Sequence, residues 1–257
     1  MNPLPELPAH ALPLPGVRRI AADRPLRWLS AGWRDLTANP LPSLAYGLLF
    51  ALAGDLIILA TLDRPHLLTV SISGFFLVAP LLAAGLNELS RRTARGERIL
   101  FIDSIRCFRR NGESMALFGL ILALAALLWE RFSAVAFALL GSSSGIDAGA
   151  FITSLVLSGE HTAFIATWFA LGGLLALGAF AISVVAVPLM LDHDADVPTA
   201  ILTSLRAFAT SPGPLLLWAA LLVGLTLIGF ATLLFGLVVI MPILGHASWH
   251  AYRDLVE

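Results

Sequence analysis

Five long apolar runs constrain the fold of this chain more than any other feature. They cover residues 41–62, 66–90, 114–138, 161–191 and 213–250. A helix needs about 20 mainly apolar residues to cross the hydrocarbon core of a bilayer, where every backbone polar group must be paired within the segment. The last run is long enough for two crossings with a tight reversal at Gly229–Gly236, although one long helix is the alternative. We therefore predict an all-α, polytopic membrane protein with six transmembrane helices.

The composition favours one membrane domain over a soluble one. Hydrophobic residues make up 58% and charged residues 13% of the 257 residues, well outside the average of soluble proteins. Residues 1–24 are rich in Pro and Leu and lack the regions of a signal peptide, so we predict a flexible tail before a single domain over residues 25–257. The lone cysteine, Cys107, excludes an intrachain disulfide and a multi-cysteine zinc site.

The cationic residues are all arginines, and they fall on one side of the predicted membrane. With six crossings, 14 of the 16 arginines lie on the side of both termini, and Arg64 and Arg131 lie on the other. The positive-inside rule then places both termini in the cytoplasm. An odd number of crossings would break this segregation.

Three similar segments precede the first, third and fifth predicted spans. They read GWRDLTANP, SIRCFRRNG and SLRAFATSP, and begin at Gly32, Ser104 and Ser204. Apolar residues recur around each at i, i+4 and i+7, which is typical of a helix. The three sets are Leu29, Trp33 and Leu36; Phe101, Ile105 and Phe108; and Ile201, Leu205 and Phe208. Such a stripe beside arginine suits an amphipathic helix lying among lipid headgroups, so the predicted headgroup contacts are Arg34, Arg106 and Arg206.

The even-numbered spans share a second pattern. VAPLL at 78–82, AVPLM at 186–190 and IMPIL at 240–244 each contain a proline, which bends a spanning helix. We predict three copies of one module, each a surface helix, a span and a proline-bent span, over about residues 25–92, 97–192 and 196–254. Arginines and helix breakers gathered at span starts without any repeat are the alternative. An extra stretch at 141–160 is either a re-entrant or surface helix or a water-exposed loop.

Few polar residues are candidates for chemistry. Asp55 lies about two-thirds of the way through the first span, where an ionisable group is costly and suggests transport, although water can reach it from the outer end. Glu130 and Arg131 could pair with Asp55 or with each other, or lie at the interface. His246 and His250 stand at i, i+4 and could bind a metal or haem, although histidines at span ends more often belong to the polar and aromatic belt.

The acidic run Asp192–Asp196 has a local structural explanation. It superficially resembles the start of a calcium loop but lacks the following Gly and the closing Glu. We predict that it caps the third surface helix, with Pro198 in the first turn. Motifs for phosphate binding, metalloprotease, nucleophile-elbow and haem-attachment chemistry are absent from the sequence. We therefore predict no catalytic, cofactor-binding or metal-binding residue and no enzyme.

The expected function follows from apolar spans that carry few charges. We expect a non-enzymatic structural, assembly or accessory protein that contacts membrane lipid and either a membrane-protein partner or further copies of itself, and not nucleic acid. The alternatives are a small transporter or channel that uses Asp55, and a haem or metal site at His246 and His250.

Four motifs carry a resemblance to a known family. They are RPLRWLSAGWRDL, PSLAYGLLF, DVPTAILTSLRA and GHASWHAYRDL. On these motifs the chain, from about Val17 to the C-terminus, resembles the bacterial integral membrane proteins of domain of unknown function 2189. The resemblance implies a multi-span protein of the bacterial inner membrane. It implies no reaction, ligand or catalytic residue.

Overall fold

Helices make up the regular structure of the described chain. The computed structural model describes residues 14–61, 83–97, 100–109, 111–140 and 162–257. The helices are α1 (Arg24–Ala38), α2 (Pro40–Thr61), α4 (Ala84–Ala94), α5 (Phe101–Ile105), the 3-10 helix η1 (Arg106–Arg109), α6 (Gly112–Leu140), α8 (Thr162–Ser183), α9 (Ala186–His193), α10 (Val197–Thr210), α11 (Pro212–Ala231) and α12 (Leu237–Leu255). The all-α prediction is confirmed for these residues, which contain one isolated β-bridge and no strand.

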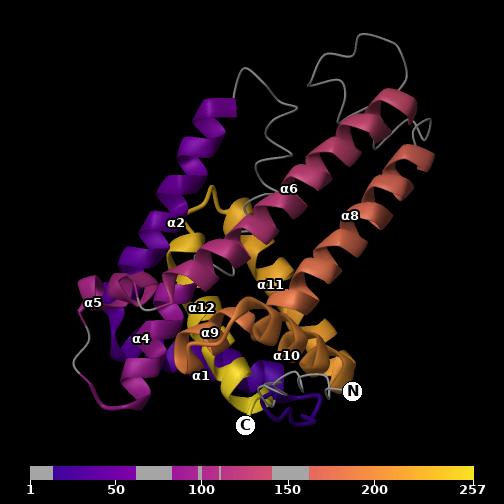
Figure 1. Ribbon diagram of the computed structural model, residues 1–257. Coiled ribbons are helices and arrows are strands. Elements are labelled where there is room, and N and C mark those ends of the chain that lie inside the picture. The colour runs from indigo at the N-terminus through magenta and orange to yellow at the C-terminus, as the bar shows by residue number, and fades with distance from the viewer. Residues whose placement is uncertain (1–13, 62–82, 98–99, 110, 141–161) are drawn as a thin grey trace, which may run out of the picture.

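The helices form two layers (Figure 1). Helices α2, α6 and α8 extend away from a short-helix layer, which consists of α1, α4, α5, α9, α10 and the C-terminal turns of α12. Four helices in the described part are long and apolar enough to cross a membrane. They are Pro40–Ala60, Gly112–Ala136, Ile165–His193 and Pro212–Ala231. The fold is therefore that of a protein with several membrane-spanning helices.

The second and sixth predicted spans are not among these four helices. Most of the run 66–90 lies outside the described residues, as does the stretch 141–160, and α4 begins at Ala84. The run 213–250 forms two helices, α11 and α12, so the single-helix alternative is wrong. Between them Leu233 and Leu234 adopt positive φ angles of 52° and 67°, which closes the predicted reversal. The helix α12 carries Pro242 inside it and ends among polar residues.

The fourth predicted span is interrupted near its proline. Helix α8 ends at Ser183, and α9 begins at Ala186 with Pro188 in its first turn. Proline lacks an N–H group and tolerates the first turn of a helix better than its interior. The interruption is bridged by Ser204 of α10, whose hydroxyl donates to the Ala181 carbonyl at 2.8 Å and accepts from the Val185 amide at 3.4 Å. The bend predicted at this proline is thus a break held by a side chain of α10.

Helix α1 buries mainly residues other than the predicted lipid-facing stripe against the rest of the chain. In α1, Trp28, Ala31, Gly32 and Leu36 are buried, whereas Trp33 of the predicted stripe is half exposed. Helix α1 packs mainly on α12, and the backbone of α12 lies so close that a Cβ on Gly32 would come within 2.4 Å of the Ile243 carbonyl oxygen. The prediction assigned the stripe to lipid, which the exposed Trp33 does not contradict, and periodicity alone did not identify the face of α1 that contacts protein.

Each surface helix joins its span through a short break. Asn39 and Ser211 have nearly the same backbone angles there, with φ and ψ of −134° and 64°, and −137° and 58°. The Asn39 amide donates to the Asp35 carbonyl at 3.0 Å, and the Ser211 amide donates to the Ala207 carbonyl at 3.2 Å. At the start of α10, the Asp196 carboxylate accepts from the Thr199 amide at 3.0 Å. The predicted cap of the third surface helix is therefore confirmed.

The two ends of the described chain lie together in the short-helix layer. Val17 and Val256 form an antiparallel bridge, in which the Arg18 amide donates to the Leu255 carbonyl at 2.9 Å. Arg24 of α1 donates two hydrogen bonds to Asp254 of α12, one of them at 2.8 Å. Both ends therefore lie on the same side of the long helices (Figure 1).

Candidate functional site

A cluster of polar side chains joins three helices of the short-helix layer to the start of α2. This buried polar cluster consists of Asp35 of α1, Ser43 of α2, Ser90 of α4 and His246 and His250 of α12. Ser43, Ser90 and His246 are each at most 1% exposed. Polar groups that are this deeply buried are stable only when they are hydrogen-bonded, so the pairing within the cluster determines what it can do.

His246 is held by a serine at each ring nitrogen. Its Nε2 lies 2.9 Å from Ser43 Oγ, and its Nδ1 lies 2.7 Å from Ser90 Oγ. Ser90 also donates to Asp35 Oδ2 at 2.6 Å, and His250 Nε2 lies 3.0 Å from the same oxygen. The cluster is therefore one connected chain from Ser43 to His250.

Counting hydrogens gives this chain a direction. A serine hydroxyl carries one hydrogen, and Ser90 uses it on the Asp35 carboxylate, so His246 Nδ1 must be the donor to Ser90. A neutral imidazole has no second hydrogen, and Nε2 must then accept from Ser43. Ser43 also donates to the Asn39 carbonyl, 2.7 Å away, and its one hydrogen serves one of the two acceptors. With that hydrogen on Nε2, hydrogen bonds run from Ser43 through His246 and Ser90 to Asp35. With it on the Asn39 carbonyl, while Ser90 donates to Asp35, both nitrogens of His246 donate and the ring is a cation.

Asp35 is the charged end of the cluster. Burial raises the pKa of this carboxyl group, but hydrogen bonds from His250 and Ser90 and the nearby histidine charge outweigh burial and place the pKa below its ordinary value. The cluster contains serine, histidine and aspartate, but a serine lies between the histidine and the aspartate, unlike the order of a hydrolytic triad. With Ser43, Ser90 and His246 closed to solvent, the arrangement ties α1, α2, α4 and α12 together.

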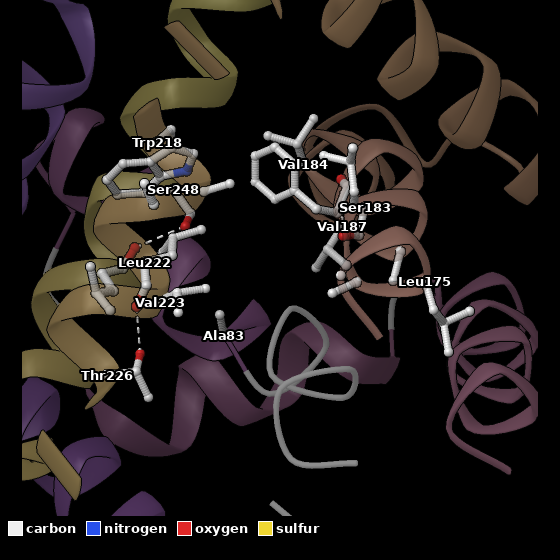
Figure 2. Close-up of a pocket in the computed structure, with 18 of the residues that line it drawn as sticks. Ala83, Leu175, Ser183, Val184, Val187, Trp218, Leu222, Val223, Thr226 and Ser248 are labelled. Carbon is white, nitrogen blue, oxygen red and sulfur yellow. Dashed lines mark hydrogen bonds between the residues drawn. The ribbon is translucent and has the colours of Figure 1, made fainter. Parts of the chain in front are cut away.

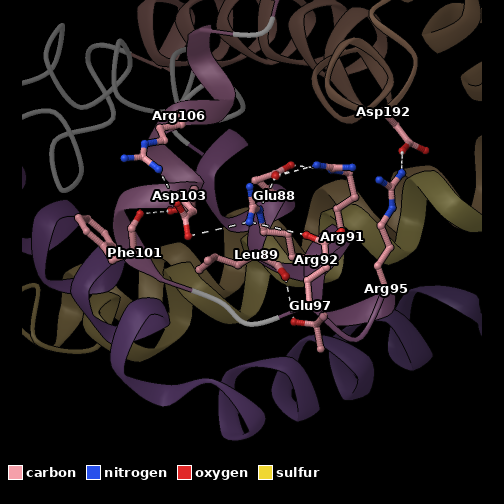
Figure 3. A network of polar contacts seen from close by, with 12 residues as sticks. Glu88, Leu89, Arg91, Arg92, Arg95, Glu97, Phe101, Asp103, Arg106 and Asp192 are labelled. Carbon is pink, nitrogen blue, oxygen red and sulfur yellow. Dashed lines mark hydrogen bonds and ion pairs between the residues drawn. The ribbon is translucent and has the colours of Figure 1, made fainter.

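A second set of polar contacts links the arginines of the layer (Figure 3). The Arg91 guanidinium forms a bidentate pair with Glu88, at 2.6 and 2.7 Å, and both side chains are buried. Arg92 also contacts Glu88, at 2.8 Å. Asp192 of α9 lies 3.5 Å from Arg95 and 3.5 Å from Arg253, so this network joins α4, α9 and α12.

A large apolar cavity lies between the long helices above the layer. Its volume is about 660 Å³. In Figure 2, Trp218, Leu222 and Val223 of α11 form one wall, and Val184 and Val187 lie across from them. No charged residue and no histidine is among the described residues that line it. The buried polar cluster and the cavity are thus separate features.

The predicted intramembrane residues are not brought together. Asp55 is exposed on α2 and does not line the cavity. Glu130 and Arg131 form an ion pair with each other on α6, as one of the predicted alternatives has it. His246 and His250 lie in the same cluster, as their spacing predicts, but their bonded nitrogens face serines and a carboxylate. Among the described residues, no group of three or more His, Cys, Asp or Glu side chains could hold a metal ion.

The predicted headgroup contacts are exposed. Arg34, Arg106 and Arg206 all reach the surface of the layer, and Arg106 pairs with Asp103 at 2.9 Å. Sequence reasoning missed Asp35, Ser43 and Ser90, because each lies on a different helix from the histidines. The only sequence signal for them is a polar residue at a position that helical periodicity places on a packed face.

The long apolar helices and the polar short-helix layer define a polytopic α-helical integral membrane protein. Residues 67–192 match the family model described as "Predicted integral membrane protein (DUF2189)". The family prediction is therefore confirmed over these residues. The matched region lies outside the four motifs on which the resemblance was based, so the wider extent of the resemblance stays a prediction. No curated protein and no solved structure matches the chain.

Proposed function

We propose that this protein is a non-enzymatic accessory protein of the bacterial inner membrane, which packs against another membrane protein or further copies of itself. The observation that carries the proposal is a contrast: the polar groups of the cluster are buried and hydrogen-bonded, whereas apolar helix faces are exposed. The buried polar cluster is internally paired, whereas Leu124, Leu127 and Leu128 of α6 are about half exposed. Surfaces of this kind contact lipid or a partner helix.

The proposed topology has six crossings with both termini in the cytoplasm. The bridge between Val17 and Val256 supports an even number of crossings, because it requires both ends to lie on one side. The excess of arginines on that side of the membrane supports the proposal that this side faces the cytoplasm. Helix α12 would then be the sixth span, with Pro242 inside it. Its polar C-terminal turns would reach the cytoplasm.

A threefold repeat of the proposed module is supported by equivalent positions. Counted from the breaks at Asn39, Asn111 and Ser211, the fourth and seventh residues are buried in all three copies. They are Ser43 and Tyr46, Met115 and Phe118, and Leu215 and Trp218. The surface helices also pack in a cycle: α1 packs on α12, α5 and η1 pack on α4, and α10 packs on α8 and α9. In each case the surface helix of one module covers the second span of the module before it.

The accessory role predicts a stable neighbour in the native membrane. A photo-reactive residue in place of Leu124 on the exposed face of α6 should cross-link to a protein, and one in place of the buried Phe118 should not. Purification in mild detergent should recover the same neighbour. A single uncross-linked chain in both experiments would contradict the proposal, and a cross-link to a second copy would identify a homo-oligomer.

The alternatives receive less support from the geometry. The exposed position of Asp55 and the charge-free lining of the cavity give no polar path through the described residues. The ring nitrogens of His246 are both engaged by serines, which leaves neither for a metal or haem without breaking the cluster. The accessory role is therefore the function that this arrangement supports best.

A further inference from the structure

The apolar cavity has a closed inner end and an open outer edge. At the inner end, Asn87 of α4 is 1% exposed, and Gly245 of α12 is also buried. Toward the outer end, Phe169 of α8 is 67% exposed and Val223 of α11 is 47% exposed. The exposed surface of these helices is apolar, so the cavity opens sideways toward lipid tails.

One buried polar atom at the closed end has no partner. Asn87 Oδ1 forms no hydrogen bond, although Asn87 lines the cavity. The hydroxyl groups along the walls are satisfied by their own helices: Ser248 donates to the Leu244 carbonyl at 2.8 Å, and Thr226 donates to the Leu222 carbonyl at 2.7 Å. A buried acceptor left without a donor costs about 1–3 kcal/mol. Asn87 therefore provides a position for a hydrogen-bond donor from outside the chain.

The length of the cavity matches one lipid tail and its polar attachment. Asn87 lies on α4, which packs on α9, whereas Trp129 of α6 lies against Gly172 of α8 at the outer end. From Gly172 to the end of α8 at Ser183, the helix rises about 17 Å. One leaflet contributes roughly half of the 30 Å hydrocarbon core, so this length matches one tail, and the break before α9 lies toward the polar end. The volume of about 660 Å³ also lies within the range of ligand cavities.

We propose that the cavity binds one diacylglycerol, an uncharged lipid with a free hydroxyl group. The hydroxyl group donates to Asn87 Oδ1 at the closed end, one tail runs along α8 toward Trp129, and the second tail leaves through the open edge. The absence of charged side chains from the described lining excludes a charged headgroup from the cavity itself, because an unpaired charge there would be unsolvated.

Tryptophan fluorescence tests the proposal, because Trp129, Trp168 and Trp218 line the cavity. The purified chain in nanodiscs is titrated with a diacylglycerol whose tails carry bromine, and separately with a brominated phosphatidylcholine. We expect the diacylglycerol to quench at a lower mole fraction, and extraction of the chain from native membranes to recover about one diacylglycerol per chain. Equal quenching by both lipids, or extraction without diacylglycerol, would overturn the proposal.

Two glycine variants make a matched pair. A Cβ at Gly173 or at Gly178 of α8 meets nothing within 4 Å, but only Gly173 is among the described residues lining the cavity. Gly173→Leu should weaken the quenching by diacylglycerol about tenfold or more, a change of about 1.4 kcal/mol. Gly178→Leu should leave it unchanged and shows that a leucine on α8 is tolerated. Equal effects of the two variants would contradict binding in this cavity.

Two further variants test which end holds the hydroxyl group. Trp129 Nε1 is the other buried atom of the lining without a hydrogen-bond partner. Asn87→Leu should weaken diacylglycerol binding, whereas Trp129→Phe, which keeps a ring and removes the N–H group, should leave extraction of the lipid unchanged. Loss with Trp129→Phe alone would overturn the assignment to Asn87. A photo-reactive residue in place of Ala176 on the cavity wall should attach to lipid, and attachment to protein would show a different occupant.

Discussion

The short-helix layer and the long helices bury their surfaces in different ways. The apolar 18-residue stretches of three of the four candidate spans are only 22–28% buried, whereas that of Ile165–His193, whose inner end is α9 of the layer, is 61% buried. The layer also buries small polar side chains, including Ser104, Thr203 and Ser204 at 0% exposure. The layer therefore has a core of its own, while the long helices depend on lipid or a partner to cover them.

This difference has a physical basis in the solvent of each region. Apolar side chains gain nothing by leaving lipid for another helix, so spans associate through close packing and hydrogen bonds. In water, burial of apolar and aromatic groups is itself stabilising, and the short-helix layer, with its many charged side chains, is the part of the described chain suited to water. Trp28 of α1 illustrates this, because it is 1% exposed and packs edge-on against Trp218 with ring centroids 5.6 Å apart.

The largest expected effect is at the contact between α2 and α12. A Cβ on Gly47 would lie 1.9 Å from the Val238 carbonyl oxygen, and backbone atoms cannot move aside as a side chain can. Gly47→Leu should lower the free energy of unfolding by more than about 3 kcal/mol and abolish most folded yield. Thermal unfolding followed by size-exclusion chromatography measures this. Gly224→Leu on α11, where a Cβ meets nothing within 4 Å, is the control, and equal effects of the two would show that α2 and α12 are not in contact.

Removal of the central histidine should have the next largest effect. His246→Leu removes the two hydrogen bonds that join Ser43 to Ser90, although Ser43 keeps the Asn39 carbonyl and Ser90 keeps Asp35 as partners. Each lost bond contributes about 0.5–1.5 kcal/mol, so we expect a loss of about 1–3 kcal/mol in the free energy of unfolding, measured by denaturant titration. Ser248→Ala, which removes a bond only to its own helix at Leu244, should cost less than about 1 kcal/mol. A small effect of His246→Leu would mean that the buried polar cluster does not tie the layer together.

The stability of the layer should fall at low pH through Asp35. The pKa of this carboxyl group is lower in the folded chain than its ordinary value, so its contribution is present above the ordinary pKa of about 4 and is lost as the pH falls through the lower folded value. Asp35→Asn should therefore be less stable than the parent protein at pH 6, and the difference in Tm should shrink toward pH 3. A difference that stays constant across this range would contradict the ionised state of Asp35.

The sequence predicted the apolar helices better than the contacts of the layer. The runs 41–62, 114–138 and 213–250 predict α2, α6 and the pair α11 and α12 closely, because length and hydropathy alone decide whether a helix can cross a membrane. The sequence analysis named no protein-facing side of α1, where Trp28 and Leu36 are buried while Trp33 is half exposed. Which apolar face contacts protein depends on the partner helix, and that partner is more than 200 residues away in the chain.

The candidate site was predictable only in part, for a similar reason. The spacing of His246 and His250 places them on one face of a helix, and both side chains belong to the buried polar cluster. Nothing in that spacing identifies Ser43 or Ser90, because these side chains meet the histidine only through the packing of α2 and α4 on α12. The cavity was also beyond prediction, since its volume depends on how far α8 and α11 stand apart.

The smallest effect should come from the helix cap at the edge of the layer. The Asp196 carboxylate accepts from the Thr199 amide at 3.0 Å at the start of α10. This hydrogen bond shares no residue with the buried polar cluster. Asp196→Ala should lower the free energy of unfolding by about 1 kcal/mol, because the first turn of a helix has amides without partners. Asp196→Asn keeps an oxygen at the same place and should recover most of that loss. If both variants lose the same amount, charge near the helix start rather than the hydrogen bond stabilises α10, and the layer depends on electrostatics more than its buried contacts indicate.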